Sequence, residues 1–275
     1  MIKQIIISIL ISVSLNTIAQ TNNRWQIEKT DNKLGFIDSL GNEIYTDNFS
    51  MLGKEYNSGL VSFIKEDEYG FLDTMGQVAF KTEKYYGEFS EGLLKVEKEG
   101  RFYYLNTKGD LEISLDSLEL PDGKEIYRIF RFSNGLAMVI ICDIGFMGSH
   151  EIAEDVIVAE YINMYPDNWH YGFVDKDGKW KIEPTLSSAT TFQDGISLIV
   201  KDSSSYFMNT NGDFVGKIYD HTGEIWTEVG SDAFDYADGF AIIYKNDSAT
   251  YINKYGQIIT SLKFQRANNF SDGMA

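Results

Sequence analysis

The chain has 275 residues, with 41 Asp and Glu against 24 Lys and Arg, and therefore a formal net charge of −17. Hydrophobic residues make up 43% and aromatic residues 14%, which excludes an intrinsically disordered chain. A single cysteine, Cys142, excludes an internal disulfide scaffold. The acidic surplus argues against a nucleic-acid partner or an anionic membrane surface, because the whole protein surface would repel either one.

Residues 1–19 have the features of a cleaved secretory signal. Lys3 supplies a positive charge, the apolar run Ile5–Leu15 follows it, and Ala19 places a small residue at the cleavage point. The run is shorter than the roughly 20 apolar residues that a membrane-spanning helix needs. We therefore expect cleavage near Ala19, no membrane-spanning segment and a secreted, periplasmic or cell-surface location, with residues 20–33 as an N-terminal lead-in.

Residues 34–275 contain two short patterns that alternate six times. The first is an aromatic residue, an aliphatic residue, Asp or Asn, any two residues and Gly. Its copies begin at Phe36, Phe71, Tyr104, Phe173, Phe207 and Tyr251. The second is an aromatic residue, any two residues and Gly, followed by apolar residues. Its copies begin at Tyr56, Phe89, Phe132, Phe192, Tyr236 and Phe270. This alternation predicts a protein built from six similar repeats.

The first pattern predicts a β-hairpin turn. Its Asp or Asn side chain accepts hydrogen bonds from backbone N–H groups further along the turn, and its Gly adopts a positive φ without a Cβ clash. We expect this conformation at Gly76 and Gly178. The second pattern opens a third strand, as in Gly92–Val96. Each unit, about 35 residues long, should then be a three-stranded antiparallel sheet that needs its neighbours to bury its apolar faces.

The expected architecture is an all-β repeat protein of six three-stranded antiparallel units in an open, twisted array. A closed β-propeller is the alternative, although a propeller blade typically has four strands. An open array would have unpaired sheet edges, through which we expect self-association. The second pattern of the sixth repeat stops in mid-strand at Ala275, so the last repeat is expected to be truncated.

One interval between repeats, residues 143–170, is much longer than the others. Within this insertion Ile152, Val156 and Ala159 have the spacing of one helical face, whereas the β-branched run Val156–Val158 favours a strand. Both alternatives stay open. We expect the insertion to depart most from the repeating sheets and to be a favoured place for a specific contact.

The sequence contains no recognisable catalytic or cofactor-binding motif. No nucleophile elbow, P-loop or dinucleotide-binding loop occurs. Asp175–Gly178 resembles the start of a calcium loop but lacks the distal glutamate, and the three histidines lack the spacing of zinc ligands. We therefore expect no catalytic residue, no cofactor and no metal. A hydrolase with an acidic pair stays an alternative, because the separations among 41 acidic side chains cannot be read from a sequence.

The alternating patterns resemble the WG-repeat family, also known as KWG repeats, over residues 34–275. Tyr69–Asp73 and Tyr171–Asp175 are similar to that family's aromatic-Gly-aromatic-aliphatic-Asp turn, and Phe132–Val139 is similar to its Phe-x-x-Gly-Leu-Ala-x-Val strand. No Trp precedes a Gly, so the dipeptide that names the family is absent, and Tyr69, Tyr171 and Leu34 stand in the place of its Trp. The resemblance implies an all-β repeat scaffold without shared catalytic residues.

Exposed aromatic side chains are the remaining candidates for function. The four tryptophans lie outside the repeat patterns, and two histidines flank the insertion. The candidate surface contacts are Trp169, Trp180, Trp226, His150 and His170. They would serve an exported, non-enzymatic scaffold that binds a protein or a cell-envelope component through an extended face. A glycan-binding module that uses exposed aromatics is the alternative function.

Overall fold

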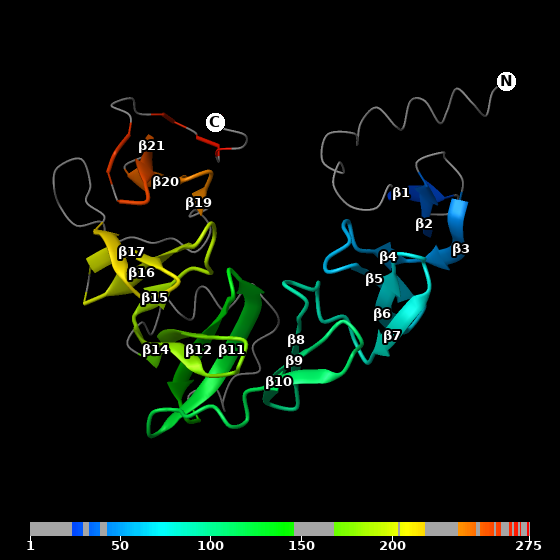
Figure 1. Ribbon diagram of the computed structural model, residues 1–275, viewed down its shortest axis with the longest axis horizontal. Helices are drawn as coiled ribbons and strands as arrows, with labels where there is room; N and C mark the ends of the chain where they lie inside the picture. The colour runs from blue at the N-terminus through cyan, green and yellow to red at the C-terminus, as the bar shows by residue number, and fades with distance from the viewer. Residues whose placement is uncertain are drawn as a thin grey trace. The chain divides into compact units, whose positions relative to one another are not determined.

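The computed structural model describes the repeat region in detail (Figure 1). The described residues are 24–29, 33–38, 43–145, 168–202, 204–217, 236–245, 248–255, 257–259, 264–265, 267–268, 270 and 274, with side chains described only from residue 49 onward. The predicted signal peptide, residues 146–167 of the insertion with the proposed helix, His150 and Trp226 lie outside this part of the chain.

The regular structure of the described residues consists of strands in six small sheets. Three sheets have three strands: β1–β2–β3 (Arg24–Lys29, Lys33–Asp38, Glu43–Phe49), β8–β9–β10 (Leu94–Lys98, Arg101–Leu105, Leu111–Ser114) and β19–β20–β21 (Tyr236–Ala237, Phe240–Lys245, Ser248–Asn253). Three sheets have four strands: β4–β7 (Met51–Leu52, Leu60–Lys65, Glu68–Asp73, Val78–Thr82), β11–β14 (Lys124–Ser133, Leu136–Asp143, His170–Val174, Trp180–Leu186) and β15–β18 (Ser188–Ala189, Ile196–Lys201, Ser204–Asn209, Phe214–Lys217). Neighbouring strands pair antiparallel, which confirms the all-β repeat prediction.

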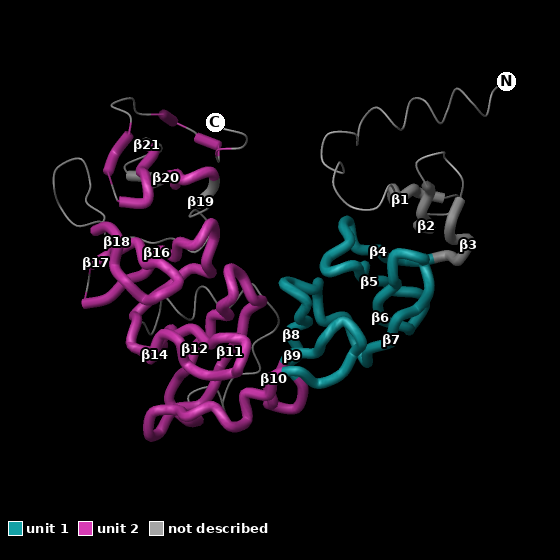
Figure 2. The backbone as a smooth tube through the Cα atoms, in the orientation of Figure 1, with its two compact units in different colours: residues 1–97, 104–112 teal, residues 98–103, 113–275 magenta. Residues whose placement is uncertain are grey.

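The chain forms two compact units (Figure 2). Unit 1 comprises residues 1–97 and 104–112, and unit 2 comprises residues 98–103 and 113–275. Unit 1 contains the sheets β1–β3 and β4–β7, whereas unit 2 contains β11–β14, β15–β18 and β19–β21. The choice between an open array and a closed propeller stays a prediction. No helix in the described part of the chain is long and apolar enough to cross a bilayer.

The turns of the first pattern have the predicted chemistry. The Asp73 Oδ1 atom accepts hydrogen bonds from the backbone N–H groups of Met75, at 2.8 Å, and Gln77, at 2.9 Å. The predicted positive φ is confirmed at both test positions, with 76° at Gly76 and 72° at Gly178. The same pair of hydrogen bonds to one side-chain oxygen recurs at Asn106, Asp175, Asn209 and Asn253.

We expect Gly76→Val to lower the free energy of unfolding by about 1–3 kcal/mol, because a β-branched side chain is strained at positive φ. Urea unfolding would measure the change. Gly76→Asn is the matched control, and its loss should be smaller because Asn tolerates this backbone region. Equal stability of the Val variant and the wild type would mean that the turn does not constrain this hairpin.

The second pattern is also a hairpin turn, which corrects the expectation that it only opens a strand. Ser58 and Gly59 both have positive φ, 56° and 81°. Asn57 and Leu60 on either side of them exchange backbone hydrogen bonds of 2.7 and 3.0 Å. This is the two-residue turn whose twist suits antiparallel strands. It explains why three sheets have a fourth, preceding strand that the three-stranded prediction omitted.

Five of the six hydrogen-bonded sheets in the described part of the chain, all except β1–β3, combine parts of two consecutive sequence repeats. β5 follows the second pattern of the first repeat, and it pairs with β6, which belongs to the first pattern of the second repeat, from Leu60↔Asp73 to Lys65↔Glu68. The central strands are covered on both faces: seven consecutive residues of β12, Leu136–Cys142, are buried. Because successive side chains point to opposite faces, the sheets need neighbours on both sides.

Candidate functional site

Turn glycines of the first pattern pack over the preceding repeat. A Cβ atom at Gly109 would lie 2.8 Å from the ring of Phe80, which is the fourth residue after the turn glycine of the repeat before. A Cβ atom at Gly178 would lie 3.0 Å from Ile113 Cγ2, the corresponding position one repeat earlier. Side chains at this fourth position are therefore occupied in packing between repeats.

Turns of the second pattern are also linked from repeat to repeat. The residue before the glycine uses its side-chain oxygen to accept a backbone N–H from the equivalent turn of the next repeat. The bonds run from Gly92 to Ser58 (2.8 Å), from Gly195 to Asn134 (2.7 Å) and from Asp238 to Asp194 (3.1 Å). These exposed polar side chains therefore have a structural role and are poor candidates for a binding site.

A different repeat position carries apolar side chains that face solvent. The second residue after the turn glycine begins or adjoins the last strand of its sheet. At this position Val78, Leu111, Phe214 and Ile258 are between 39% and 59% exposed. We refer to these four residues, of which Val78 and Leu111 lie in unit 1 and Phe214 and Ile258 in unit 2, as the exposed apolar row, a name for their shared repeat position. Trp180 occupies the same position in the fourth repeat and is half-buried.

Trp180 is held by two contacts within unit 2. Its indole Nε1–H donates a hydrogen bond of 2.7 Å to the Glu119 carbonyl oxygen. Its ring covers Gly172, where a Cβ atom would lie only 2.7 Å from Trp180 Cζ3. With the indole in this place, there is no room for a side chain at residue 172. The structure thus gives this candidate contact residue a packing role.

The fifth repeat has Tyr206 where the fourth has Gly172. The Tyr206 ring contacts the outer strand β18 of its sheet. The rings of Tyr206 and Phe214 stack with centroids 4.9 Å apart and an interplanar angle of 17°. Lys217 Nζ lies 5.6 Å from the Tyr206 ring centroid, and Lys201 Nζ lies 6.0 Å from that of Phe214. We name these four residues the aromatic–lysine surface. Sequence reasoning concentrated on Trp and missed it, although the replacement of Gly by Tyr206 was a visible signal.

Trp169 is a core residue, so its assignment as a surface contact was wrong. Its side chain is only 1% exposed, and its ring centroid lies 4.5 Å from that of Tyr127. It belongs to a buried cluster with Tyr171 and Cys142. Burial, assisted by the nearby Glu125 carboxylate, raises the pKa of the Cys142 thiol to about 11. The thiol is therefore buried and protonated at neutral pH.

His170 is half-buried at the start of β13, close to an ion pair at the ends of β11 and β12. Lys124 Nζ lies 2.8 Å from Asp143 Oδ1. Burial lowers the pKa of His170, Lys124 lowers it further, and Asp143 acts in the opposite direction. His170 is therefore neutral in the folded protein at neutral pH. The other candidate contact histidine, His150, lies outside the described residues.

The lowered pKa of His170 predicts a pH-dependent stability. The unfolded chain binds the proton more readily than the folded chain, so stability should fall as the pH drops below the ordinary histidine pKa of about 6.5. We expect this fall to be smaller in His170→Gln than in the wild type, measured by urea unfolding from about pH 7.5 to about pH 5.5. Parallel curves for the two proteins would contradict the assignment.

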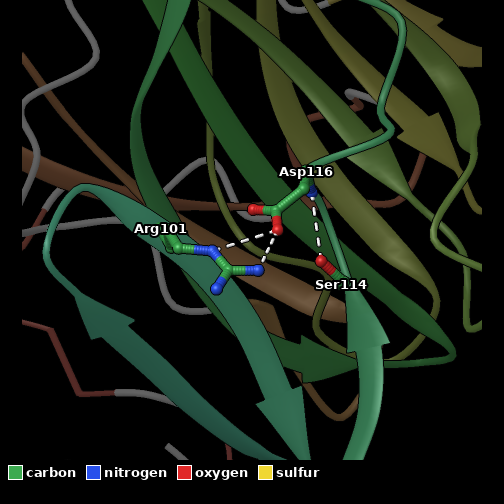
Figure 3. Close-up of polar contacts among 3 residues, drawn as sticks. All are labelled: Arg101, Ser114 and Asp116. Atoms are coloured by element: carbon green, nitrogen blue, oxygen red, sulfur yellow. Dashed lines mark hydrogen bonds and ion pairs between the residues drawn. The ribbon is translucent and has the colours of Figure 1, made fainter.

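An exposed polar cluster follows β10 (Figure 3). The Arg101 guanidinium donates to Asp116 Oδ2 through Nε at 3.0 Å and also through Nη2, and the Asp116 N–H donates to Ser114 Oγ at 3.3 Å. The hydrogen bond from Arg101 lowers the pKa of Asp116. Such exposed pairs contribute little to stability. The cluster links Arg101, at the start of β9, to the residues at and just after the end of β10.

Within the described residues, no three side chains of His, Cys, Asp or Glu come together as metal ligands. At the turn that resembles a calcium loop, Asp175 Oδ1 accepts the backbone N–H groups of Asp177 at 3.0 Å and Lys179 at 3.1 Å. These bonds direct one carboxylate oxygen toward the backbone of the turn. The described geometry of this turn is that of a structural hairpin.

Two segments match the family described as "WG containing repeat", residues 171–203 and 250–275. The chain carries WG repeats. The first segment spans the fourth repeat, from β13 through β16, and the second lies in the sixth repeat from β21 onward. The resemblance found in the sequence is confirmed over these two WG repeats. No curated protein sequence matches the chain.

Solved structures similar to this WG-repeat chain include a eukaryotic initiation factor, with 12% identity, 88% of this chain and 63% of that chain covered, and a TM-score of 0.44. Hsv2p of Kluyveromyces lactis has 7% identity, coverages of 86% and 73%, and a TM-score of 0.44. The WD40 domain of SCAP from fission yeast has 10% identity, coverages of 87% and 62%, and a TM-score of 0.34. The chain thus spans less than two thirds of the first and third structures, and likenesses this low carry no argument about function.

Proposed function

We propose that this chain is an exported, non-enzymatic WG-repeat scaffold that binds another protein or a cell-envelope component. The observation that carries the proposal is the exposed apolar row, in which four repeats present an apolar side chain to solvent at the same position. Two of these residues lie in each compact unit, and repeat proteins bind partners through positions that recur in this way. The predicted secretory signal supports a partner outside the cytoplasm.

The role of the other repeat positions supports this reading. Turn glycines such as Gly109 and the side chains beneath them, such as Phe80, are occupied in packing between repeats. The residues of the exposed apolar row leave much of their surface in water, so folding gains little from them. Apolar surface that recurs without a folding role is typical of interaction sites.

The proposal can be tested by capture from envelope fractions of the source organism. The mature chain, starting at residue 20, would be immobilised beside a variant with Val78, Leu111, Phe214 and Ile258 changed to Ser. A control variant would carry Lys179→Ser and Glu183→Ser, which change exposed polar residues instead. We expect the wild type and the control to retain the same component and the apolar-row variant to lose it. Equal capture by the apolar-row variant and the wild type, or the absence of any specifically captured component, would refute the proposal.

A further inference from the structure

We propose that the aromatic–lysine surface binds a polysaccharide that carries carboxylate groups, with one pyranose ring stacked on Phe214. This inference rests on the proposed binding role and names the ligand class for one part of the surface. It concerns Lys201, Tyr206, Phe214 and Lys217 on strands β16, β17 and β18.

The ring pair is a flat, supported platform. Phe214 is 50% exposed, whereas Tyr206 beneath it is half-buried and packs against the core of unit 2. Stacking at 4.9 Å and 17° restricts both rings before any ligand arrives. A rigid aromatic contact loses little conformational entropy on binding. The apolar C–H face of a pyranose ring matches such a flat surface in size and polarity.

The two lysines favour a sugar that carries a carboxylate. Their Nζ atoms lie within 6.0 Å of the ring centroids, one lysine for each ring of the pair. A carboxylate on a sugar stacked on Phe214 would be within reach of the Lys201 ammonium group. Two acidic residues, Asp202 and Asp213, lie close in sequence to Lys201 and Phe214. The Asp213 carboxylate is engaged in its own turn, where it accepts a hydrogen bond of 3.1 Å from Asn209 Nδ2.

The charge of the whole protein limits the charge density of the ligand. A net charge of −17 opposes a densely charged polyanion such as a nucleic acid. At physiological ionic strength the Debye length is about 8 Å, so lysines near the rings act more strongly than distant acids. A glycan with one carboxylate per sugar gains both the stacking contact and the attraction to the nearby lysines. A polyanion without sugar rings gains only the attraction to the lysines.

A peptide strand fits this surface less well. β18 has only four residues, Phe214–Lys217, and so offers a short edge for strand addition. A Cβ atom at Gly216 would clash with the backbone of Tyr255, so the turn of the sixth repeat lies against this strand. The surface therefore presents rings and charges rather than a long edge of backbone hydrogen-bonding groups.

Binding of polygalacturonate to the mature chain, measured by calorimetry, tests the proposal, with neutral dextran and polyglutamate as comparison polymers. We expect Phe214→Ala to weaken polygalacturonate binding roughly two- to tenfold. Lys201→Gln should reduce the preference for polygalacturonate over dextran. Met75→Ala is the control, since it removes an apolar side chain that is 65% exposed and lies outside both proposed surfaces, and it should bind like the wild type.

Several results would overturn the inference. These are no binding of polygalacturonate, equal binding by Phe214→Ala and the wild type, or a loss in Lys201→Gln alone, which would indicate simple ion pairing. Polyglutamate binding with the same dependence on Phe214 would assign the surface to an acidic peptide. Envelope capture that depends on the exposed apolar row and survives Phe214→Ala alone would retain the scaffold proposal while removing this one.

Discussion

Replacing Trp169 by Ala should lower the free energy of unfolding by about 3–5 kcal/mol, the usual cost of removing a large buried aromatic side chain. The side chain is 1% exposed and contacts the core cluster that includes Tyr171 and Phe173. Truncation would leave a cavity among side chains of strands β12 and β13, which belong to the same sheet and cannot move independently to fill it. Chemical denaturation followed by circular dichroism would measure the loss.

Phe214→Ala provides the matched comparison, because it removes an aromatic ring of which half is already exposed. Its effect on stability should be about 1 kcal/mol, mainly from the lost stacking on Tyr206. A loss for Trp169→Ala as small as this would place Trp169 at the surface after all and would return it to the candidate contact residues.

The second large effect is expected for Gly172→Ala, which should cost about 3 kcal/mol, at the upper end of the range for overpacked sites. The added Cβ atom would lie 2.8 Å from the Ile182 carbonyl oxygen and 2.9 Å from Pro184 Cα. Both are backbone atoms of the neighbouring strand β14, so relief requires the two strands to separate. Urea unfolding of the mature chain gives the required comparison.

Two further variants separate the backbone clash from the contact with Trp180. Tyr206→Ala keeps a Cβ atom at the same repeat position in the fifth repeat, where the chain accommodates one, and should cost only about 1 kcal/mol through lost stacking. Gly172→Ala combined with Trp180→Ala removes the indole but leaves the strand in place. Full recovery of stability in that double variant would identify the ring, and not the strand, as the obstacle.

The turns of the first pattern were predictable because their chemistry is local. Asp73 and Gly76 lie within four residues of each other, and the side-chain hydrogen bonds and positive φ follow from residue type alone. The turns of the second pattern were missed although they contain Asn134-Gly135 and Asp194-Gly195, dipeptides that are strong signals for a two-residue hairpin. The aromatic and apolar residues of that pattern drew attention to the strand that follows.

The candidate site was less predictable because exposure is a tertiary property. Trp169 and Trp180 were chosen since they lie outside the repeat patterns, but a position outside a pattern does not determine what covers it. Trp169 is buried by Tyr127, which lies more than forty residues earlier in the chain. Phe214 faces solvent because Tyr206 supports it from the neighbouring strand. Only the pairing of β17 with β18 brings those two rings together.

The stagger between sequence repeats and sheets constrains how such a chain gains or loses repeats during evolution. Recombination at a repeat boundary exchanges half of one sheet and half of the next, so the incoming half must match its new partner in length. β5, β16 and β20 each have six residues and pair along their full length with the following six-residue strand, so strand length does not oppose exchange among their repeats. β12 has eight residues and pairs with the five of β13 over Ala137–Ile141 only, so this junction does not share the equal strand lengths of the other three.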